Sequence, residues 1–352
     1  MPHLKSPFIY FGGKSSIADV IWNFFGDGIQ NYVEPFFGSG AVLLSRPDWT
    51  TGKRLTETIN DADGFLANFW RALQSDPDGV AEYADWPVNE SDLEARHLWL
   101  VNRRKALTDK LNDPDFYDVK FAGWWVWGIN CWIGSGWCSG EGPWIYDENA
   151  KKIMDSRKLP HLGDDGRGVH RKLPHLGDDG RGVHRQLPHL GNDGRGVHRQ
   201  LPHLGDDGRG LRDYLGQLAQ RLRWVRVCCG DWSRIMGPTV TVGHGITAVF
   251  LDPPYSSEAN RDMGCYAVDC GKIAHDVRKW CEDNGDDPRL RICLAGYEGE
   301  GHEALVRKGW RVQAWKASGG YENQSHGDAP GNCRKERLWF SPGCIRKQEE
   351  MF

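Results

Sequence analysis

At 352 residues the chain is long enough to bury a large core and to form more than one domain. Its 44 Lys and Arg against 48 Asp and Glu give a net charge of −4, which argues against a uniformly basic nucleic-acid protein but leaves room for one basic face. The ten cysteines form no CxxC pair and no zinc-ligand spacing, so we predict no metal site and expect reduced thiols in a cytoplasmic protein. The sequence shows no signal-peptide pattern and no apolar run long enough to span a membrane. We therefore expect neither a signal peptide nor a transmembrane helix.

A glycine pair followed by a lysine opens the first predicted α/β unit. Apolar residues lead into Gly12, Gly13 and Lys14, and a helix is predicted from about Ser16 to Phe25. Glycines let the backbone approach a ligand closely, and a helix start favours an anionic group. The GxxxxGK[ST] spacing of a phosphate-binding loop is missing, and a plain turn before a helix is the structural alternative.

The next segment has the order strand, glycine-rich turn, helix. A short strand ends at Glu34, glycines follow at Gly38 and Gly40, and a helix is predicted to begin near Ala41. The glycines would leave space for a cofactor, and Glu34 could pair with a cationic part of it. The GxGxxG pattern is absent, which disfavours a dinucleotide, and an ordinary β-to-α turn is the alternative.

A second strand over residues 55–61 ends in Asp61, about 20 residues beyond the glycine turn, a spacing that suits a carboxylate bonded to ribose hydroxyls. A helix through Leu66, Phe69 and Trp70 follows, and its apolar residues are predicted to be core.

Residues 75–120 are predicted to be helical and polar, with a local basic cluster at Arg103 and Arg104. Phosphate contact and a solvated helix face are the two interpretations of that cluster. A tryptophan-rich helix is predicted within residues 121–137. We expect most of its indoles to form a small core, with stacking on displaced bases as the alternative.

Four near-identical units of 14 residues occupy residues 158–213. Each unit holds three glycines and one proline, which forbid long helices, and few apolar residues. A flexible surface insertion is the favoured interpretation.

The remainder returns to alternating helices and strands. Helices are predicted over about 211–222 and 272–284, with a further helical segment over 303–308, and strands over 224–229, 246–251 and 290–295. Residues 311–317 and 336–341 are predicted to form a terminal β-hairpin, where Lys316 and Arg334 could touch phosphates or lie at solvated strand ends. Asp231 follows the strand over 224–229. From its position it could serve either as a ligand-binding carboxylate or as the N-cap of a following helix.

The strand over 246–251 runs into Asp252-Pro253-Pro254-Tyr255. Two prolines stop the strand and make a rigid turn at its carboxyl end, where open α/β sheets bind ligands. This turn places a carboxylate, a peptide carbonyl and an aromatic ring close together. An exocyclic amine of a flat base could donate hydrogen bonds to the first two and stack on the third. A tight Asp-Pro turn with a buried tyrosine is the structural alternative.

Five segments in this order resemble the motifs of the Dam-like, D12 class of DNA adenine N6-methyltransferases. They are FGGK (11–14), EPFFGSG (34–40), IND (59–61), CCGDW (228–232) and DPPY (252–255). The resemblance implies a Rossmann-like S-adenosylmethionine-dependent methyltransferase sheet, with a helical target-recognition insert and a repeat-containing loop. It implies a discontinuous catalytic domain over 1–74 and 214–345, the insert over 75–157 and the repeat loop over 158–213.

The resemblance also assigns roles to residues. The catalytic set is Asp252, Pro253, Pro254 and Tyr255. The cofactor set is Tyr10, Gly12, Gly13, Lys14, Glu34, Pro35, Phe36, Gly38, Gly40, Asp61, Asp231, Trp232 and Asp252. Asn130 matches the end of the family's recognition helix and joins Arg103, Arg104, Lys316 and Arg334 as expected DNA contacts. One departure is Tyr10, where the family commonly has tryptophan, and ring stacking stays possible there.

The implied activity is transfer of a methyl group from S-adenosylmethionine to N6 of an adenine flipped out of double-stranded DNA. Two alternatives stay open. Cytosine N4 has an amine of the same geometry, although the first Asp of the motif leans to adenine, and a decayed relative would bind nucleic acid without catalysis. A cognate restriction endonuclease is a conceivable partner, and a monomer is the favoured state.

Overall fold

The computed structural model describes residues 4–8, 10, 13–47, 49, 55–132, 137–138, 144–147, 152–155, 209–254, 272–315 and 336–345. These residues form two compact units. Unit 1 comprises the described parts of 1–6, 10–67 and 221–352, and unit 2 those of 7–9 and 68–220. The breaks fall inside α3 (Gly64–Ser75) and α8 (Arg209–Leu222). The domain limits given by the sequence stay a prediction.

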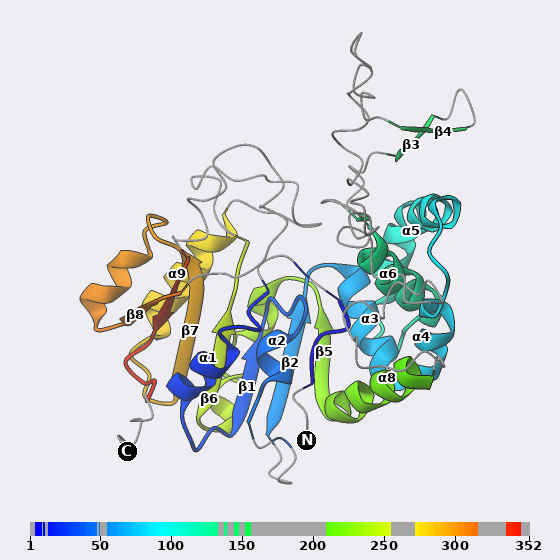
Figure 1. The fold of residues 1–352 in the computed structure, drawn as a ribbon. Helices are drawn as coiled ribbons and strands as arrows, with labels where there is room; N and C mark the ends of the chain where they lie inside the picture. The colour runs from blue at the N-terminus through cyan, green and yellow to red at the C-terminus, as the bar shows by residue number, and fades with distance from the viewer. Residues whose placement is uncertain are drawn as a thin grey trace, which may run out of the picture. The chain divides into compact units, whose positions relative to one another are not determined.

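A seven-stranded sheet lies at the centre of unit 1, in the order β5-β2-β1-β6-β7-β9-β8 (Figure 1). The strands are β1 (Asn31–Glu34), β2 (Thr56–Asp61), β5 (Val225–Cys229), β6 (Thr247–Leu251), β7 (Leu290–Tyr297), β8 (Arg311–Ala314) and β9 (Glu336–Phe340). The first five strands of that order pair in parallel, and β9 pairs antiparallel with β7 and β8. The carboxyl ends of the parallel strands therefore meet at one edge, where ligands bind in such sheets. The predicted α/β class and the terminal hairpin are confirmed.

Sequence explains the central position of β6. Its five residues, Thr-Ala-Val-Phe-Leu, are all buried and rich in strand formers. Around the sheet lie α1 (Ala18–Phe25), α2 (Ala41–Leu44), α9 (Ile273–Asn284) and the 3₁₀ segments η2 (Trp232–Ile235), η3 (Val242–His244) and η6 (His302–Lys308). The predicted helix at Ala41 is only one turn long, because Pro47 disfavours helical backbone at the preceding residue. The helix expected over 303–308 is a 3₁₀ segment.

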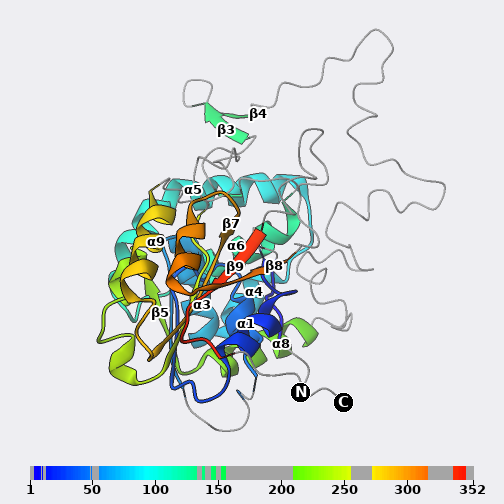
Figure 2. The ribbon, with the colours of Figure 1, turned by 90° about the vertical axis from the view of Figure 1, so that its left-hand side faces the viewer.

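Unit 2 is built on α4 (Pro77–Ala84), α5 (Glu90–Lys110) and α6 (Val119–Cys131), with most of α3 and α8. Figure 2 shows α5 side-on. Asp76, Asn89 and Asp118 cap the starts of α4, α5 and α6 by accepting hydrogen bonds from backbone N–H groups. A two-stranded hairpin, β3 (Trp144–Asp147) and β4 (Lys152–Asp155), was not predicted.

Aromatic residues make the core of unit 2. Trp125 and Trp127 are buried, and the Phe8 ring packs edge-on against Trp125 with 5.1 Å between centroids. Gly123 allows α6 to approach α4 closely, since a Cβ there would come within 2.3 Å of the Cβ of Tyr83. The expectation that most of these indoles are core is confirmed for the described ones, whereas Trp124 is only partly buried.

Within the described residues, no helix has the length and apolar character needed to cross a membrane. The described cysteines are free thiols. No group of metal-ligating side chains was found in the same part of the chain.

Candidate active site

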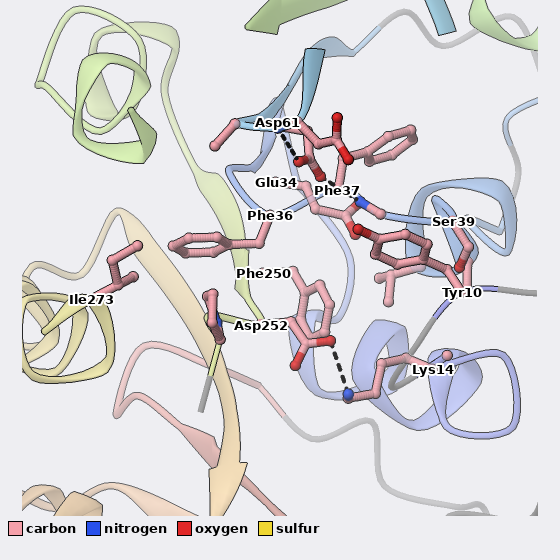
Figure 3. A pocket seen from close by; sticks show the side chains of 17 residues that line it. Tyr10, Lys14, Glu34, Phe36, Phe37, Ser39, Asp61, Phe250, Asp252 and Ile273 are labelled. Carbon is pink, nitrogen blue, oxygen red and sulfur yellow. Dashed lines mark hydrogen bonds and ion pairs between the residues drawn. The ribbon is translucent and has the colours of Figure 1, made fainter. Parts of the chain in front are cut away.

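A pocket opens at the carboxyl edge of β1, β2 and β6 in unit 1 (Figure 3). Its walls are formed by the turn at Gly13 and Lys14, the glycine-rich turn after β1, and the ends of β2 and β6. The lining residues are Tyr10, Gly13, Lys14, Glu34, Phe36, Phe37, Gly38, Ser39, Ala41, Val42, Asp61, Ala62, Asp63, Phe250, Asp252, Pro254 and Ile273.

Asp252, directly after β6, forms an ion pair with Lys14. The Lys14 Nζ lies 2.8 Å from Asp252 Oδ2, and the side chains are 3% and 20% exposed. The ammonium also lies 5.6 Å from the centroid of the Trp315 ring. The lysine therefore holds the Asp252 carboxylate at the pocket, while part of that carboxylate still faces solvent.

Glu34 lies deeper in the pocket, at the end of β1. Its side chain is buried and accepts a hydrogen bond from the Tyr32 hydroxyl at 2.7 Å. Burial raises the pKa of the Glu34 carboxyl well above its usual value, and the negative charges of Asp252 and Asp61 raise it further. A cationic ligand beside Glu34 would act in the opposite direction and favour the charged form of this carboxyl.

Asp61 ends β2 and ties the neighbouring turns together. Its Oδ2 accepts a hydrogen bond from the Gly38 N–H at 3.0 Å and its Oδ1 accepts one from the Asp63 N–H at 2.9 Å. Burial raises the pKa of Asp61 to about 7, although both hydrogen bonds act in the opposite direction. The carboxyl thus changes its charge near neutral pH.

The glycine-rich turn needs its glycines. Gly38 has φ +48°, and a Cβ on it would come within 2.9 Å of the Tyr10 ring. At Gly40, with φ +69°, a Cβ would lie 2.5 Å from the Phe37 ring. Side chains at these positions would strain the backbone and push rings into the pocket.

Comparison with known proteins agrees with this geometry. Residues 10–118 match the family model of the D12 class N6 adenine-specific DNA methyltransferases. The match indicates a DNA adenine methyltransferase. No curated protein gives a significant match to the chain. The matched range contains Tyr10, Lys14, Glu34 and Asp61, whereas Asp252 lies beyond it and joins them through the fold.

Asp231 and Trp232, from the fourth of the five sequence motifs, are not among the described residues that line the pocket. Asp231 caps η2 by accepting a hydrogen bond from the Ser233 N–H at 3.0 Å, which is the structural alternative given above. Trp232 is buried in the core and stacks on Phe36, a lining residue, at 6.0 Å between ring centroids. Trp232 therefore supports the pocket wall indirectly, by packing against Phe36.

The other predicted site residues fall into two groups. Pro35, Gly40 and Pro253 are described but are absent from the lining, and the Pro35 carbonyl accepts a hydrogen bond from Asn60 at 3.1 Å. Gly12, Tyr255, Lys316 and Arg334 lie outside the described residues.

The described residues expected to contact DNA have different surroundings in unit 2. Asn130 is buried, and its Nδ2 donates to the carbonyls of Pro7 and Val126 at 3.0 and 2.8 Å. In this structure the side chain lies in the core of unit 2, and its contact with DNA stays a prediction. Arg104 donates to the Cys138 carbonyl, whereas Arg103 is exposed.

Several lining residues were missed by sequence reasoning, namely Phe37, Ser39, Ala41, Val42, Ala62, Asp63, Phe250 and Ile273. Strand alternation could have found Phe250, because it lies two residues before Asp252 and so points to the same side. Phe37 and Ser39 flank Gly38, and Ala62 and Asp63 directly follow Asp61, so extending these two motifs by one or two residues would have found them. No sequence signal places Ile273, at the start of α9, beside them.

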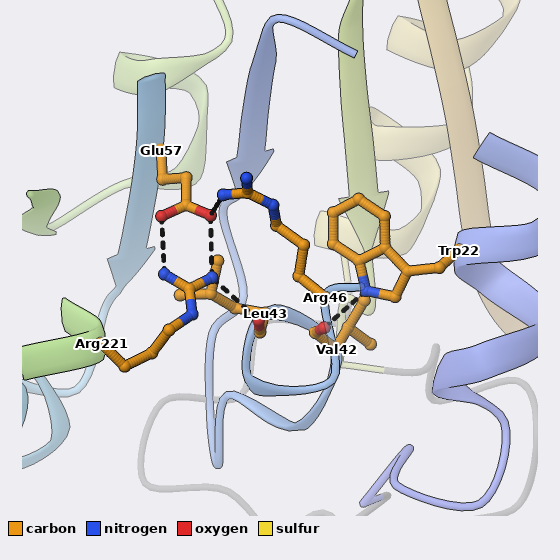
Figure 4. Close-up of polar contacts among 6 residues, drawn as sticks. All are labelled: Trp22, Val42, Leu43, Arg46, Glu57 and Arg221. Carbon is orange, nitrogen blue, oxygen red and sulfur yellow. Dashed lines mark hydrogen bonds and ion pairs between the residues drawn. The ribbon is translucent and has the colours of Figure 1, made fainter. Parts of the chain in front are cut away.

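A second polar cluster of unit 1 lies at the amino end of β2, away from the pocket-forming end (Figure 4). The buried Glu57 carboxylate accepts hydrogen bonds from Arg46 Nη1 at 2.6 Å and from Arg221 Nη1 and Nη2, both at 2.8 Å. Arg221 Nη2 also donates to the Leu43 carbonyl at 3.0 Å. This cluster joins α8, β2 and the end of α2, and its role is structural.

Proposed function

We propose that the protein transfers a methyl group from S-adenosylmethionine to the N6 amino group of an adenine flipped out of double-stranded DNA. The observation that carries this proposal is the Lys14–Asp252 ion pair at a pocket that also holds Glu34 and Asp61. Four sequence motifs with the order of the D12 class thereby contribute to one site.

The residues of the pocket fit the cofactor. Its carboxyl groups suit a ligand that carries a sulfonium, an amine and ribose hydroxyls, and Gly38 lets the backbone lie close to it. Glu34 and Asp61 would hold it, with Tyr10 and Phe36 offering ring faces. When bound, S-adenosylmethionine would supply a methyl group on a positively charged sulfur.

Asp252 and the carbonyl of Pro253 would accept hydrogen bonds from the two N6 hydrogens of adenine. Such acceptors draw the amine toward a tetrahedral shape and free its lone pair. The lone pair would then accept the methyl group that S-adenosylmethionine supplies, with a neutral thioether as the leaving group, and the surplus N6 proton would pass to water. The main contribution of the protein is alignment and desolvation, so no covalent enzyme intermediate is required.

The target base must leave the duplex to reach Asp252, which costs a few kcal/mol. In this proposal Tyr255 stacks on the flipped base, and residues 75–157 act as the target-recognition insert.

The repeat over 158–213 is proposed to be a loop that the catalytic unit does not need. Deletion of residues 158–199, which are three whole periods, is expected to shift the thermal midpoint by less than about 3 °C, because few apolar residues are removed. Thermal unfolding followed by circular dichroism measures this. A shift of 10 °C or more would show that the repeat is structural.

The test of the function is incubation with S-adenosylmethionine and mixed-sequence duplex DNA, followed by nucleoside mass spectrometry. N6-methyladenine is the expected product. N4-methylcytosine would keep the mechanism and change the target base. Cofactor binding without any methylated base would overturn the proposal in favour of a binding role.

A pH-dependent prediction follows from Asp61. Its raised pKa means that the folded protein keeps a proton up to pH about 7, whereas the unfolded chain releases it near pH 4. The free energy of unfolding therefore falls as pH rises between these values. In Asp61→Asn this part of the fall, about 4 kcal/mol, should disappear. The amide has one acceptor oxygen for the two N–H groups that Asp61 binds, which costs about 2 kcal/mol, so the cofactor-free variant should be more stable than wild type at pH 8 by roughly 2 kcal/mol. Cofactor affinity should drop at least about tenfold, as expected for the loss of a charged acceptor.

Urea unfolding from pH 4 to 8 and calorimetric titration with S-adenosylmethionine measure the two effects. Asp287→Asn is the control, because Arg289 lowers the pKa of that carboxyl and its removal changes stability in the opposite direction. The same pH slope in Asp61→Asn and wild type would contradict the assignment.

A further inference from the structure

Two helices of unit 2 share a surface on which cations lie over indole rings. We call it the cation–indole face and define it by Trp99 and Arg103 of α5 with Lys120 and Trp124 of α6. Arg103 is exposed, and the other three side chains are partly exposed. The two helices pack side by side (Figure 1), so the four side chains form one surface rather than two.

The distances define a compact arrangement. Lys120 Nζ lies 4.4 Å from the Trp124 ring centroid and 4.9 Å from that of Trp99. The Arg103 guanidinium carbon lies 4.6 Å from the Trp99 ring, and the two indoles meet edge-on at 5.1 Å. Each cation is thus held by an aromatic face.

Beneath this surface, Arg96 supports Trp124. Its guanidinium lies 5.1 Å from the Trp124 ring and 4.3 Å from the Trp127 ring, and its side chain is 7% exposed. Its Nη1 finds no hydrogen-bond partner among the described residues. Asp92 acts on Arg96 electrostatically, but the Asp92 carboxylate already accepts hydrogen bonds from Trp86 and Asn89.

The charge of this surface is not balanced by neighbouring acids in the sequence. No Asp or Glu occurs from residue 95 to 108, and α6 contains none. Asp118 directly precedes α6, and its carboxylate accepts the N–H groups of Lys120 and Phe121 as the helix cap. The stretches of α5 and α6 that carry this face thus contain basic residues and no acidic ones, in a protein of net charge −4.

Cation–π contact leaves the donors of these side chains available. A carboxylate partner would accept hydrogen bonds from the ammonium or guanidinium N–H groups. A ring face attracts the positive charge but has no oxygen or nitrogen acceptor, so the N–H groups can still donate to an anion. Lys120 is held by two rings, and Arg103 makes one long hydrogen bond, from Nη1 to the Trp99 carbonyl at 3.4 Å. Both are pre-oriented to meet an anion. The repeated anion that pairs with rigid, spaced cations is the phosphate backbone of a nucleic acid.

We propose that the cation–indole face binds the phosphate backbone of duplex DNA, with Lys120 and Arg103 as the phosphate contacts and Trp99 and Trp124 as their rigid support. This rests on the proposed function for the choice of DNA as partner. The face carries affinity rather than sequence preference, because phosphate contacts do not distinguish bases.

The test measures the binding of a fluorescent duplex by anisotropy between 50 and 200 mM salt, at concentrations chosen in that range because salt dependence is strong there. Lys120→Gln should weaken binding about fivefold on every duplex and reduce the slope of log K against log salt by about one. Arg103→Gln should act in the same direction. Lys120→Arg should stay near wild type, because it keeps the charge over the rings.

Lys105→Gln is the matched control. It removes the same charge from α5 at a side chain that is 89% exposed and paired with Asp109. Equal affinity and slope for Lys120→Gln and Lys105→Gln would overturn the inference, as would a loss of slope that appears only with single strands. Methyl transfer by wild type is measured separately. Duplex binding without methyl transfer would overturn the proposed function alone, and methyl transfer with an unchanged slope in Lys120→Gln would overturn this inference alone.

Discussion

Replacing Asp252 by asparagine is expected to lower methyl transfer at least about 100-fold while S-adenosylmethionine binding changes little. The amide can accept a hydrogen bond through its oxygen, but it carries no charge and its nitrogen donates where an acceptor is needed. The amide oxygen can still accept from Lys14, which lies 2.8 Å from the carboxylate in the wild type, so the lysine keeps a partner. Asp252→Ala would remove that partner too and add a stability cost.

Single-turnover methylation with saturating DNA and cofactor, read by nucleoside mass spectrometry, measures the effect. Calorimetry with S-adenosylmethionine separates binding from chemistry. Asp283→Asn on the exposed side of α9 is the control, since its carboxylate pairs only on the surface with Lys279. Methylation within threefold of wild type in Asp252→Asn would exclude this carboxylate as the acceptor for the amine.

Replacing Glu57 by alanine is expected to destabilise the protein by roughly 3–5 kcal/mol. The glutamate is 5% exposed and pairs with two arginines, whose side chains are 7% and 3% exposed. Its loss leaves two guanidinium groups in a dry interior with no carboxylate between them. The folded state then bears their desolvation without the attraction that offset it.

Urea unfolding gives the free energy, and Asp283→Ala provides the comparison because surface pairs contribute about 0–1 kcal/mol. A triple replacement of Arg46, Glu57 and Arg221 by Met, Leu and Met should be more stable than Glu57→Ala, since no buried charge remains. A loss below about 1 kcal/mol in Glu57→Ala would mean that water reaches the arginines and would contradict their burial.

Local patterns predicted the parts of the site that depend on neighbouring residues. Glu34, Asp61 and Asp252 each follow an apolar strand, and parallel strands bring their carboxyl ends together, so their meeting in one pocket follows from strand order. Composition also predicted that most indoles of the tryptophan-rich helix are core.

Contacts between distant residues could not be predicted in the same way. The Lys14–Asp252 pair joins residues 238 positions apart, and no pattern near Lys14 indicates its partner. Asn130 fits the end of a recognition helix in sequence, yet its hydrogen bond to the Pro7 carbonyl, 123 positions away, keeps it in the core. At Asp231 the short-range alternative, a cap of η2, is the contact that forms.

Strand β1 lies inside the sheet and pairs with β2 on one side and with β6 on the other, and β6 begins at Thr247. During synthesis at about 5–20 residues per second, roughly 10–40 s separate the emergence of these two strands from the ribosome. For that time one edge of β1 has no partner, and an open edge is a template for pairing with other chains. We therefore expect the nascent chain to need chaperones. A chain that ends before Thr247 would leave β1 with an unpaired, aggregation-prone edge.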